Sequence, residues 1–193
     1  MFRQLAPGLK MMILFTILTG LIYPSLVTAL CQLFFTRQAN GSLIVQKGRV
    51  IGSALLGQNF TRPDYFHPRP SAAGNEGYDP TSSGGSNLGP TSQKLYDRIR
   101  SAAMQFRKEN PDYTGPIPAD ALTTSASGLD PDISLANAYA QAARVARARG
   151  ASLTAIQQLI ASTAQGRDLG FLGEPRVNVL RLNLALDRDF PRH

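Results

Sequence analysis

The sequence predicts an α+β protein in which a single N-terminal transmembrane helix precedes one mixed soluble domain. Residues 11–35 carry no charged side chain for 25 positions, and the rest of the chain mixes helical and strand patterns at ordinary polarity. A helix of that length spans roughly 37 Å, enough to cross a hydrocarbon core of about 30 Å. We therefore expect a short cytoplasmic tail over 1–10, a transmembrane helix over 11–35 and one extracytoplasmic domain over 36–193.

Two alternatives to an uncleaved anchor are open. A secretory signal peptide needs a basic start, a short apolar core and a small-residue cleavage site. Arg3 and Lys10 supply the start and residues 27–29 supply the site. Cleavage there would leave an apolar N-terminus, which favours the uncleaved anchor. Lipid attachment at the sole cysteine, Cys31, is disfavoured because Leu30 stands where a small residue is needed.

The predicted membrane helix has a face of small residues. Thr16, Gly20, Pro24 and Thr28 recur every fourth position and so lie on one side of a helix. Helices associate in lipid through close backbone approach and interhelical hydrogen bonds, so we expect this face to dock against another membrane protein. A passive anchor with small residues by chance is the alternative. Pro24 has no N–H to donate, which predicts a kink.

The orientation of the helix follows from the charges that flank it. Arg3 and Lys10 precede the helix, and Arg37, Lys47 and Arg49 follow it, so the count is nearly balanced. A short tail before a first apolar segment usually stays in the cytoplasm, and long domains cross largely regardless of charge. We expect the N-terminus inside and the domain outside.

The net charge of +7 does not indicate a nucleic-acid partner. Basic residues are scattered, apart from Arg144, Arg147 and Arg149. Nucleic-acid binding would need a basic stripe interleaved with aromatic side chains. We expect no nucleic-acid contact.

The soluble domain begins with strand patterns and an irregular segment. Residues 43–45 and 49–56 are apolar runs bounded by glycines, which predicts two short strands. Residues 65–71 combine aromatic residues with prolines, which predicts an ordered loop without regular structure.

Helical patterns follow later in the chain. Helices are predicted over 91–109, 134–149 and 152–165, and a final strand over 177–184 because its apolar and polar residues alternate. Asp130 and Asp132 are expected at the positive N-terminus of the second helix.

No pattern in the sequence predicts a catalytic or metal site. The glycine-rich loop over 83–88 resembles a phosphate-binding loop, but it lacks the Gly-Lys-[Ser/Thr] ending. A tight structural loop is therefore the better interpretation. A serine hydrolase could use only His67 or His193, and no Gly-x-Ser-x-Gly motif is present. We expect no cofactor bound by this chain. An independent anchored or exported hydrolase or binding domain is the alternative function. The loop residues are Ser83, Gly84, Gly85, Ser86, Asn87 and Leu88.

Eight segments, in order along nearly the whole chain, resemble the family of C subunits of the Kdp potassium-transporting ATPase. They include Thr-Gly and Tyr-Pro in the membrane helix, Tyr-Phe-His-Pro-Arg-Pro-Ser-Ala and Ser-Gly-Gly-Ser-Asn-Leu. The segments span 19–24, 38–43, 52–60, 65–72, 83–88, 126–130, 141–149 and 177–186.

The resemblance implies a non-catalytic accessory subunit of an ATP-driven, P-type potassium uptake pump in the bacterial plasma (inner) membrane. Its implied partners are a K⁺-binding channel-like subunit, a P-type ATPase subunit, a small membrane subunit and the lipid bilayer. ATP, K⁺ and Mg²⁺ would serve the complex. The resemblance also implies assembly of the complex and a catalytic-chaperone role that raises the ATP affinity of the ATPase subunit.

The resemblance further implies nucleotide contact by Gln141 and Arg144. This conflicts with the expected orientation, because an external domain meets no cytoplasmic ATP. A solvated or partner-facing Gln141 is the alternative, and an external domain would instead cover the K⁺ entrance.

Overall fold

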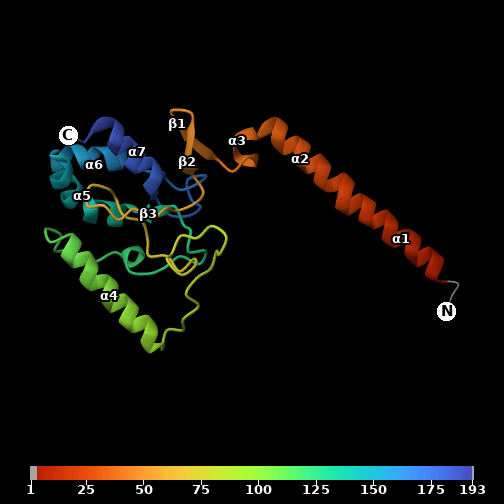
Figure 1. The fold of residues 1–193 in the computed structure, drawn as a ribbon, viewed down its shortest axis with the longest axis horizontal. Helices are drawn as coiled ribbons and strands as arrows, with labels where there is room; N and C mark the ends of the chain where they lie inside the picture. Colours follow the sequence, from red (N-terminus) through yellow and green to blue (C-terminus); the bar gives the residue numbers. More distant parts are fainter. Residues whose placement is uncertain (1–3, 193) are drawn as a thin grey trace. The chain divides into compact units, whose positions relative to one another are not determined.

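The computed structural model describes residues 4–192, and its contacts divide the chain into two compact units with a boundary between Ile51 and Gly52 (Figure 1). The first unit contains a continuous apolar helix, Leu5–Phe34, with a mean hydropathy of 2.0. It consists of α1 (Leu5–Ile17), a π-helical turn η2 (Leu18–Ile22) and α2 (Tyr23–Phe34). Within residues 4–192 this is the one helix long and apolar enough to cross a membrane.

The π-helical turn lies where the sequence predicts an irregularity. The Tyr23 N–H donates to the Leu18 carbonyl, one residue farther back than in an α-helix, just before Pro24. Such turns accommodate local breaks in the helical hydrogen-bond ladder. The helix begins at Leu5, so Lys10 lies within it. Met1, Phe2 and Arg3 of the predicted tail fall outside the described residues.

The first unit continues with α3 (Thr36–Ala39) and β1 (Leu43–Gln46). β1 pairs in a two-stranded sheet with β2 (Arg49–Ser53), the strand that contains the unit boundary. Lys47 and Gly48 join the strands, and both have positive φ, as a tight hairpin turn requires. The two strands predicted in this region are confirmed.

The second unit is a mixed helix and strand domain, so the α+β prediction is confirmed. Its elements are α4 (Gln93–Glu109), a 3₁₀ turn η3 (Ala119–Ala121), β3 (Asp132–Ser134), α5 (Leu135–Arg149), α6 (Leu153–Thr163), β4 (Arg176–Asn178) and α7 (Val179–Asp189).

The core of this unit lies between the α5, α6 and α7 helices and the small β3–β4 sheet, which cluster together in Figure 1. The two strands are antiparallel, with Ile133 opposite Val177, and both side chains are buried. Phe66 from the irregular loop is also fully buried in this cluster. The loop therefore belongs to the core even though it has no regular structure.

The strand predicted over 177–184 is wrong, because only Arg176–Asn178 is a strand and α7 begins at Val179. Val179, Leu182 and Leu186 are buried at helical spacing, while the same sequence also alternates at a period of two. The side chain of Asn178 accepts a hydrogen bond from the Arg181 N–H and starts the helix. The Asn178 cap thus favours the helical period over the strand period in this segment.

The acidic residues predicted at the start of α5 are also misplaced. Asp132 lies in β3, where its carboxylate pairs with Arg176. Asp120 of η3 instead accepts hydrogen bonds from the Ser134 N–H (2.8 Å) and hydroxyl (2.9 Å). Ser134 in turn caps α5 by accepting from the Asn137 N–H. The helix start is therefore tied to a distant turn rather than to the preceding aspartates.

Candidate functional site

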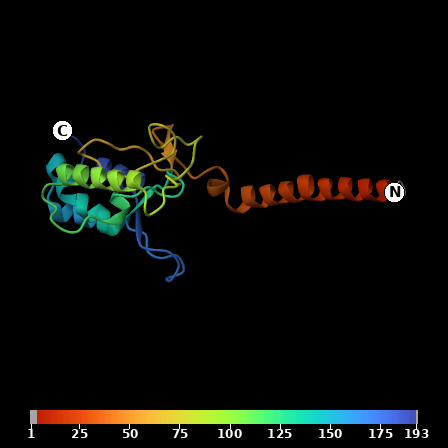
Figure 2. The same cartoon turned by 90° about the horizontal axis from the view of Figure 1, so that it is seen from below.

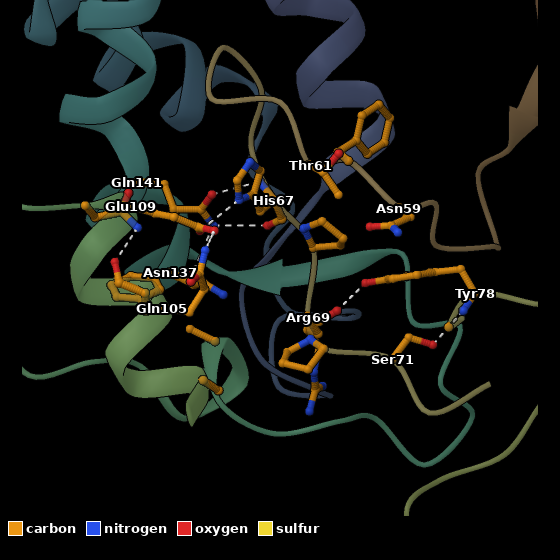
Figure 3. A pocket seen from close by; sticks show the side chains of 18 of the residues that line it. Asn59, Thr61, His67, Arg69, Ser71, Tyr78, Gln105, Glu109, Asn137 and Gln141 are labelled. Atoms are coloured by element: carbon orange, nitrogen blue, oxygen red, sulfur yellow. Dashed lines mark hydrogen bonds and ion pairs between the residues drawn. The ribbon is translucent and has the colours of Figure 1, made fainter. Parts of the chain in front are cut away.

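Two adjacent residues of the irregular loop, Phe66 and His67, have their backbone groups paired by side-chain amides. The Phe66 N–H donates to Oδ1 of Asn183 (2.9 Å), and its carbonyl accepts from Nδ2 of the same side chain (3.0 Å). Gln141 makes the equivalent pair with His67, at 2.8 and 3.0 Å (Figure 3). Buried backbone groups without such partners would be costly. Helices α5 and α7 therefore hold the loop through two amides.

Gln141 uses its whole hydrogen-bonding capacity inside the domain. Besides its two bonds to His67, Nε2 donates to Oδ1 of Asn137 (2.9 Å) and Oε1 accepts from Nη2 of Arg144 (2.6 Å). A primary amide offers two donors and two lone pairs, and all four are engaged. The residue is 2% exposed, which contradicts the alternative of a solvated Gln141. A direct nucleotide contact stays a prediction and would require breaking one of these bonds.

Arg144 lies next to Gln141 and is also buried. Its Nη1 donates to the carbonyls of Pro63 (2.6 Å) and Tyr65 (2.8 Å), and its Nε donates to Oδ1 of Asn110 (3.0 Å). Burial lowers the pKa of Arg144 to about 10, so the guanidinium is still charged at neutral pH. One arginine thus joins α5 to the loop and to the end of α4.

A second buried arginine, Arg149, ties the same loop to the end of the chain. Its Nε donates to the Asp64 carbonyl (2.9 Å), and its Nη2 pairs with Asp187 (2.8 Å). The guanidinium lies over the Tyr65 ring, 4.9 Å from the centroid, and the Tyr65 hydroxyl donates to Asp187. The sequence shows Arg149 only as part of a basic helix end. No local pattern identifies its distant partners.

His67 faces hydrogen-bond acceptors on both sides of its ring. Nδ1 lies 3.2 Å from Oε2 of Glu109, and Nε2 lies 2.9 Å from the Arg62 carbonyl; Nη1 of Arg144 is farther from Nε2, at 3.4 Å. The hydrogen bond from His67 lowers the pKa of Glu109. A catalytic base needs a free lone pair. Both ring nitrogens of His67 are engaged within the domain, which favours a positioning role.

A cavity of about 340 Å³ lies between this loop, α4 and α5, and Figure 3 shows its lining. Polar side chains converge on it, among them Asn59, Thr61, Gln105 and Glu109. Its size lies at the lower end of the range of small-molecule sites. Gln105 donates to Glu109 at 2.5 Å, so these two polar groups are paired with each other.

The glycine-rich loop 83–88 packs tightly against another loop, as its structural interpretation predicts. The Gly84 N–H and the Ser83 hydroxyl both donate to the Ser127 carbonyl, at 2.8 and 3.0 Å. A Cβ on Gly85 would lie 3.0 Å from the Ala126 carbonyl oxygen. Ser83 lines another cavity with residues 124–127 and 129–131, not the one that Gln141 lines.

Gly128→Ala is expected to destabilise the domain by about 2 kcal/mol. Gly128 has φ +68°, and an added Cβ would lie 2.7 Å from the Gly84 carbonyl oxygen and 2.8 Å from the Ala73 nitrogen. Gly84→Ala is the matched control, since nothing lies within 4 Å of its Cβ position. Urea unfolding of the full chain in mild detergent, followed by tyrosine fluorescence, measures both. Equal stability of the two variants would contradict the packing argument.

The predicted docking face lies on the apolar helix of the first unit. Thr16, Gly20, Pro24 and Thr28 are all exposed within that unit. The Thr16 hydroxyl donates to the Met12 carbonyl at 2.8 Å, and among the described residues the nearest side-chain atom to the Cβ position of Gly20 belongs to Thr16, at 4.0 Å. The groove beside Gly20 is therefore open. His193, one of the two candidate histidines, lies outside the described residues.

These features define a membrane-anchored protein with one apolar N-terminal helix and a small α+β domain closed by buried amides and arginines. The family described as "KdpC: K+-transporting ATPase, c chain" matches residues 5–188. The chain belongs to this family.

Curated relatives are similar over nearly the whole chain. A protein of Myxococcus xanthus named potassium-transporting ATPase KdpC subunit is 56% identical over 98% of this chain and 90% of its own length. Proteins of the same name from Koribacter versatilis and Mycobacterium bovis are 54% and 55% identical over 99% and 97% of this chain, and over 97% and 100% of their own lengths.

Proposed function

We propose that the chain is a non-catalytic accessory subunit of an ATP-driven potassium uptake pump, which it assembles and stabilises. Its partners would be the K⁺-binding channel-like subunit, the P-type ATPase subunit and the small membrane subunit of the same complex, within the bacterial inner membrane. ATP, K⁺ and Mg²⁺ would be bound by the complex rather than by this chain alone.

The observation that carries the proposal is the closed hydrogen-bond network around Gln141 and Arg144. The family resemblance singles out these two residues. Their polar groups form hydrogen bonds with the backbone and side chains of this same chain. Chemistry on a substrate needs groups that can change partners. A network of this kind instead suits a rigid body that supports other subunits.

The catalytic-chaperone role, raising the ATP affinity of the ATPase subunit, would act through the assembled complex and not through nucleotide contact by Gln141. Two arguments support this. The amide has no unused donor or lone pair. The N-terminus is placed in the cytoplasm and the domain outside by the rule for a short first tail, which separates the domain from cytoplasmic ATP.

Gly20→Leu is expected to lower recovery of the complex several-fold while the soluble domain remains folded. A leucine would fill the open groove beside Gly20 and prevent close helix approach. The measurement is a pull-down of the tagged full chain from mild-detergent membranes of potassium-starved cells, scored by co-purified P-type ATPase and potassium-stimulated ATP hydrolysis. Ala29→Leu, outside the row of small residues, is the matched control.

Three outcomes of this pull-down are distinct. Recovery of the unsubstituted chain without any ATPase would overturn the proposed function. Normal recovery of the Gly20→Leu complex would remove only the docking role of this face. Equal losses for Gly20→Leu and Ala29→Leu would show that the helix is sensitive to bulk on any side.

A further inference from the structure

The segment between α6 and β4 leaves the domain as a narrow hairpin, which Figure 2 shows extending away from the helices. Gln165 and Arg176 pair their backbones at its base, through bonds of 2.8 and 3.0 Å. Nearer the end, Asp168 and Leu172 exchange two backbone bonds of 2.9 Å. The hairpin is therefore an ordered projection.

The end of this hairpin is apolar and exposed. Leu169, Phe171 and Leu172 are 83, 69 and 48% exposed, and we refer to these three residues as the apolar tip. Single exposed apolar residues are ordinary on a protein surface, but a contiguous group marks an interaction site more often. Within the described residues, none of these three side chains is buried in the domain core.

The backbone of the apolar tip adopts a strained conformation. Leu169 has φ +54° and Gly170 has φ +83°. A leucine in the left-handed region is strained, and such strain persists where the surrounding structure imposes it. Here the backbone hydrogen bonds between Asp168 and Leu172 impose the strained conformation of Leu169. The hairpin thus holds the backbone at Leu169 in one conformation.

Below the apolar tip, in the stem of the hairpin, the positive and negative side chains are equal in number. Arg167 pairs with Glu174 (2.9 Å), and Arg176 pairs with Asp168 (3.2 Å) and with Asp132 of β3 (3.2 Å). These pairs leave no excess of positive charge near the tip. They also fasten the stem to the domain, so the tip is ordered before any partner arrives.

We propose that the apolar tip inserts into an apolar pocket on the water-exposed surface of another protein subunit of the same complex. The inference rests on the proposed function and names a contact for it. A fixed, strained shape favours a pocket of matching shape, because a fluid bilayer would accept any apolar loop. The balanced stem also lacks the Lys and Arg excess that binds proteins to anionic lipid surfaces.

The test is site-specific photo-crosslinking in the assembled complex. The photo-reactive amino acid p-benzoyl-phenylalanine is placed at position 171 of the full chain, and the complex is irradiated in native membranes. We expect one crosslinked product, of this chain with another pump subunit. Crosslinking only to lipid, only to a second copy of this chain, or to nothing would overturn the proposal. The same analogue at position 104, where the exposed Met104 of α4 lies outside the hairpin, measures the background.

A pair of variants separates docking from folding. Leu169→Gly removes an apolar side chain and also relieves the positive-φ strain, so its domain should unfold at the same or higher urea concentration. Combined with Phe171→Ser, it should reduce the amount of the chain that remains with the complex on size exclusion by about tenfold. Met104→Ser is the control for losing an exposed apolar side chain. Undiminished retention of the double variant would overturn the proposal.

The failure of this inference and that of the proposed function are distinguishable. If the unsubstituted chain does not co-purify with the pump, the proposed function fails and the docking contact fails with it. If the unsubstituted chain co-purifies but position 171 gives no crosslink to another subunit, only the docking contact fails.

Discussion

Arg144→Met is expected to lower the free energy of unfolding of the soluble domain by about 3–5 kcal/mol. Methionine can fill much of the same volume, but it has no donors. The carbonyls of Pro63 and Tyr65 and Oδ1 of Asn110 would each lose a buried partner. The loss should appear as a lower urea midpoint of the full chain in detergent, followed by tyrosine fluorescence.

Arg147→Met is the matched control for Arg144→Met. Arg147 lies one turn farther along α5, and its partner Asp112 is exposed like itself. An exposed ion pair contributes about 0–1 kcal/mol. The two substitutions are the same in chemistry and differ in burial. If both variants unfold at the same urea concentration, the buried arginine does not hold the loop.

Gln141→Leu is expected to destabilise the domain by about 3 kcal/mol, because it leaves the N–H and carbonyl of His67 and Oδ1 of Asn137 without partners. Gln158→Leu is the control, since Gln158 is exposed on α6. The measurement has two parts, the unfolding midpoint of the chain and the ATP concentration dependence of hydrolysis by the purified complex.

The two parts of this measurement distinguish a structural from a nucleotide-binding glutamine. A structural Gln141 predicts a lower unfolding midpoint and, in complexes that still assemble, an unchanged ATP dependence. If Gln141 contacts nucleotide, the variant complex should need a higher ATP concentration for half-maximal hydrolysis, while the unfolding midpoint of the chain stays unchanged. Because Gln141 and Arg144 share a hydrogen bond, the double variant should lose less stability than the two single losses added together.

Local signals predict the helices and first strands of this protein well. Gly150, with φ +63°, ends α5 at the residue where the sequence places its end. Both first strands begin as predicted, although the second ends at Ser53, three residues before the predicted end. Such signals depend on residues close together in the chain. The prediction fails over 177–184, where apolar residues fit both a strand and a helix and the Asn178 cap decides.

The candidate site could be predicted only in part. The irregular loop around His67 is predicted from its aromatic residues and prolines, and it is ordered as expected. Its partners are not predictable from local pattern: Asn183 and Gln141 lie far from it in the chain, and a polar residue on a helix normally suggests a solvated face. The pairing exists because the loop brings unsatisfied backbone groups into the core.

The contacts of the loop with the end of the chain have a consequence for the timing of folding. Phe66 is paired by Asn183, and Tyr65 contacts Asp187 and Arg192, all within the last stretch of the described sequence. A chain emerging from the ribosome presents the apolar helix before these partners. The loop can therefore form these contacts only after residues 183–192 have been translated.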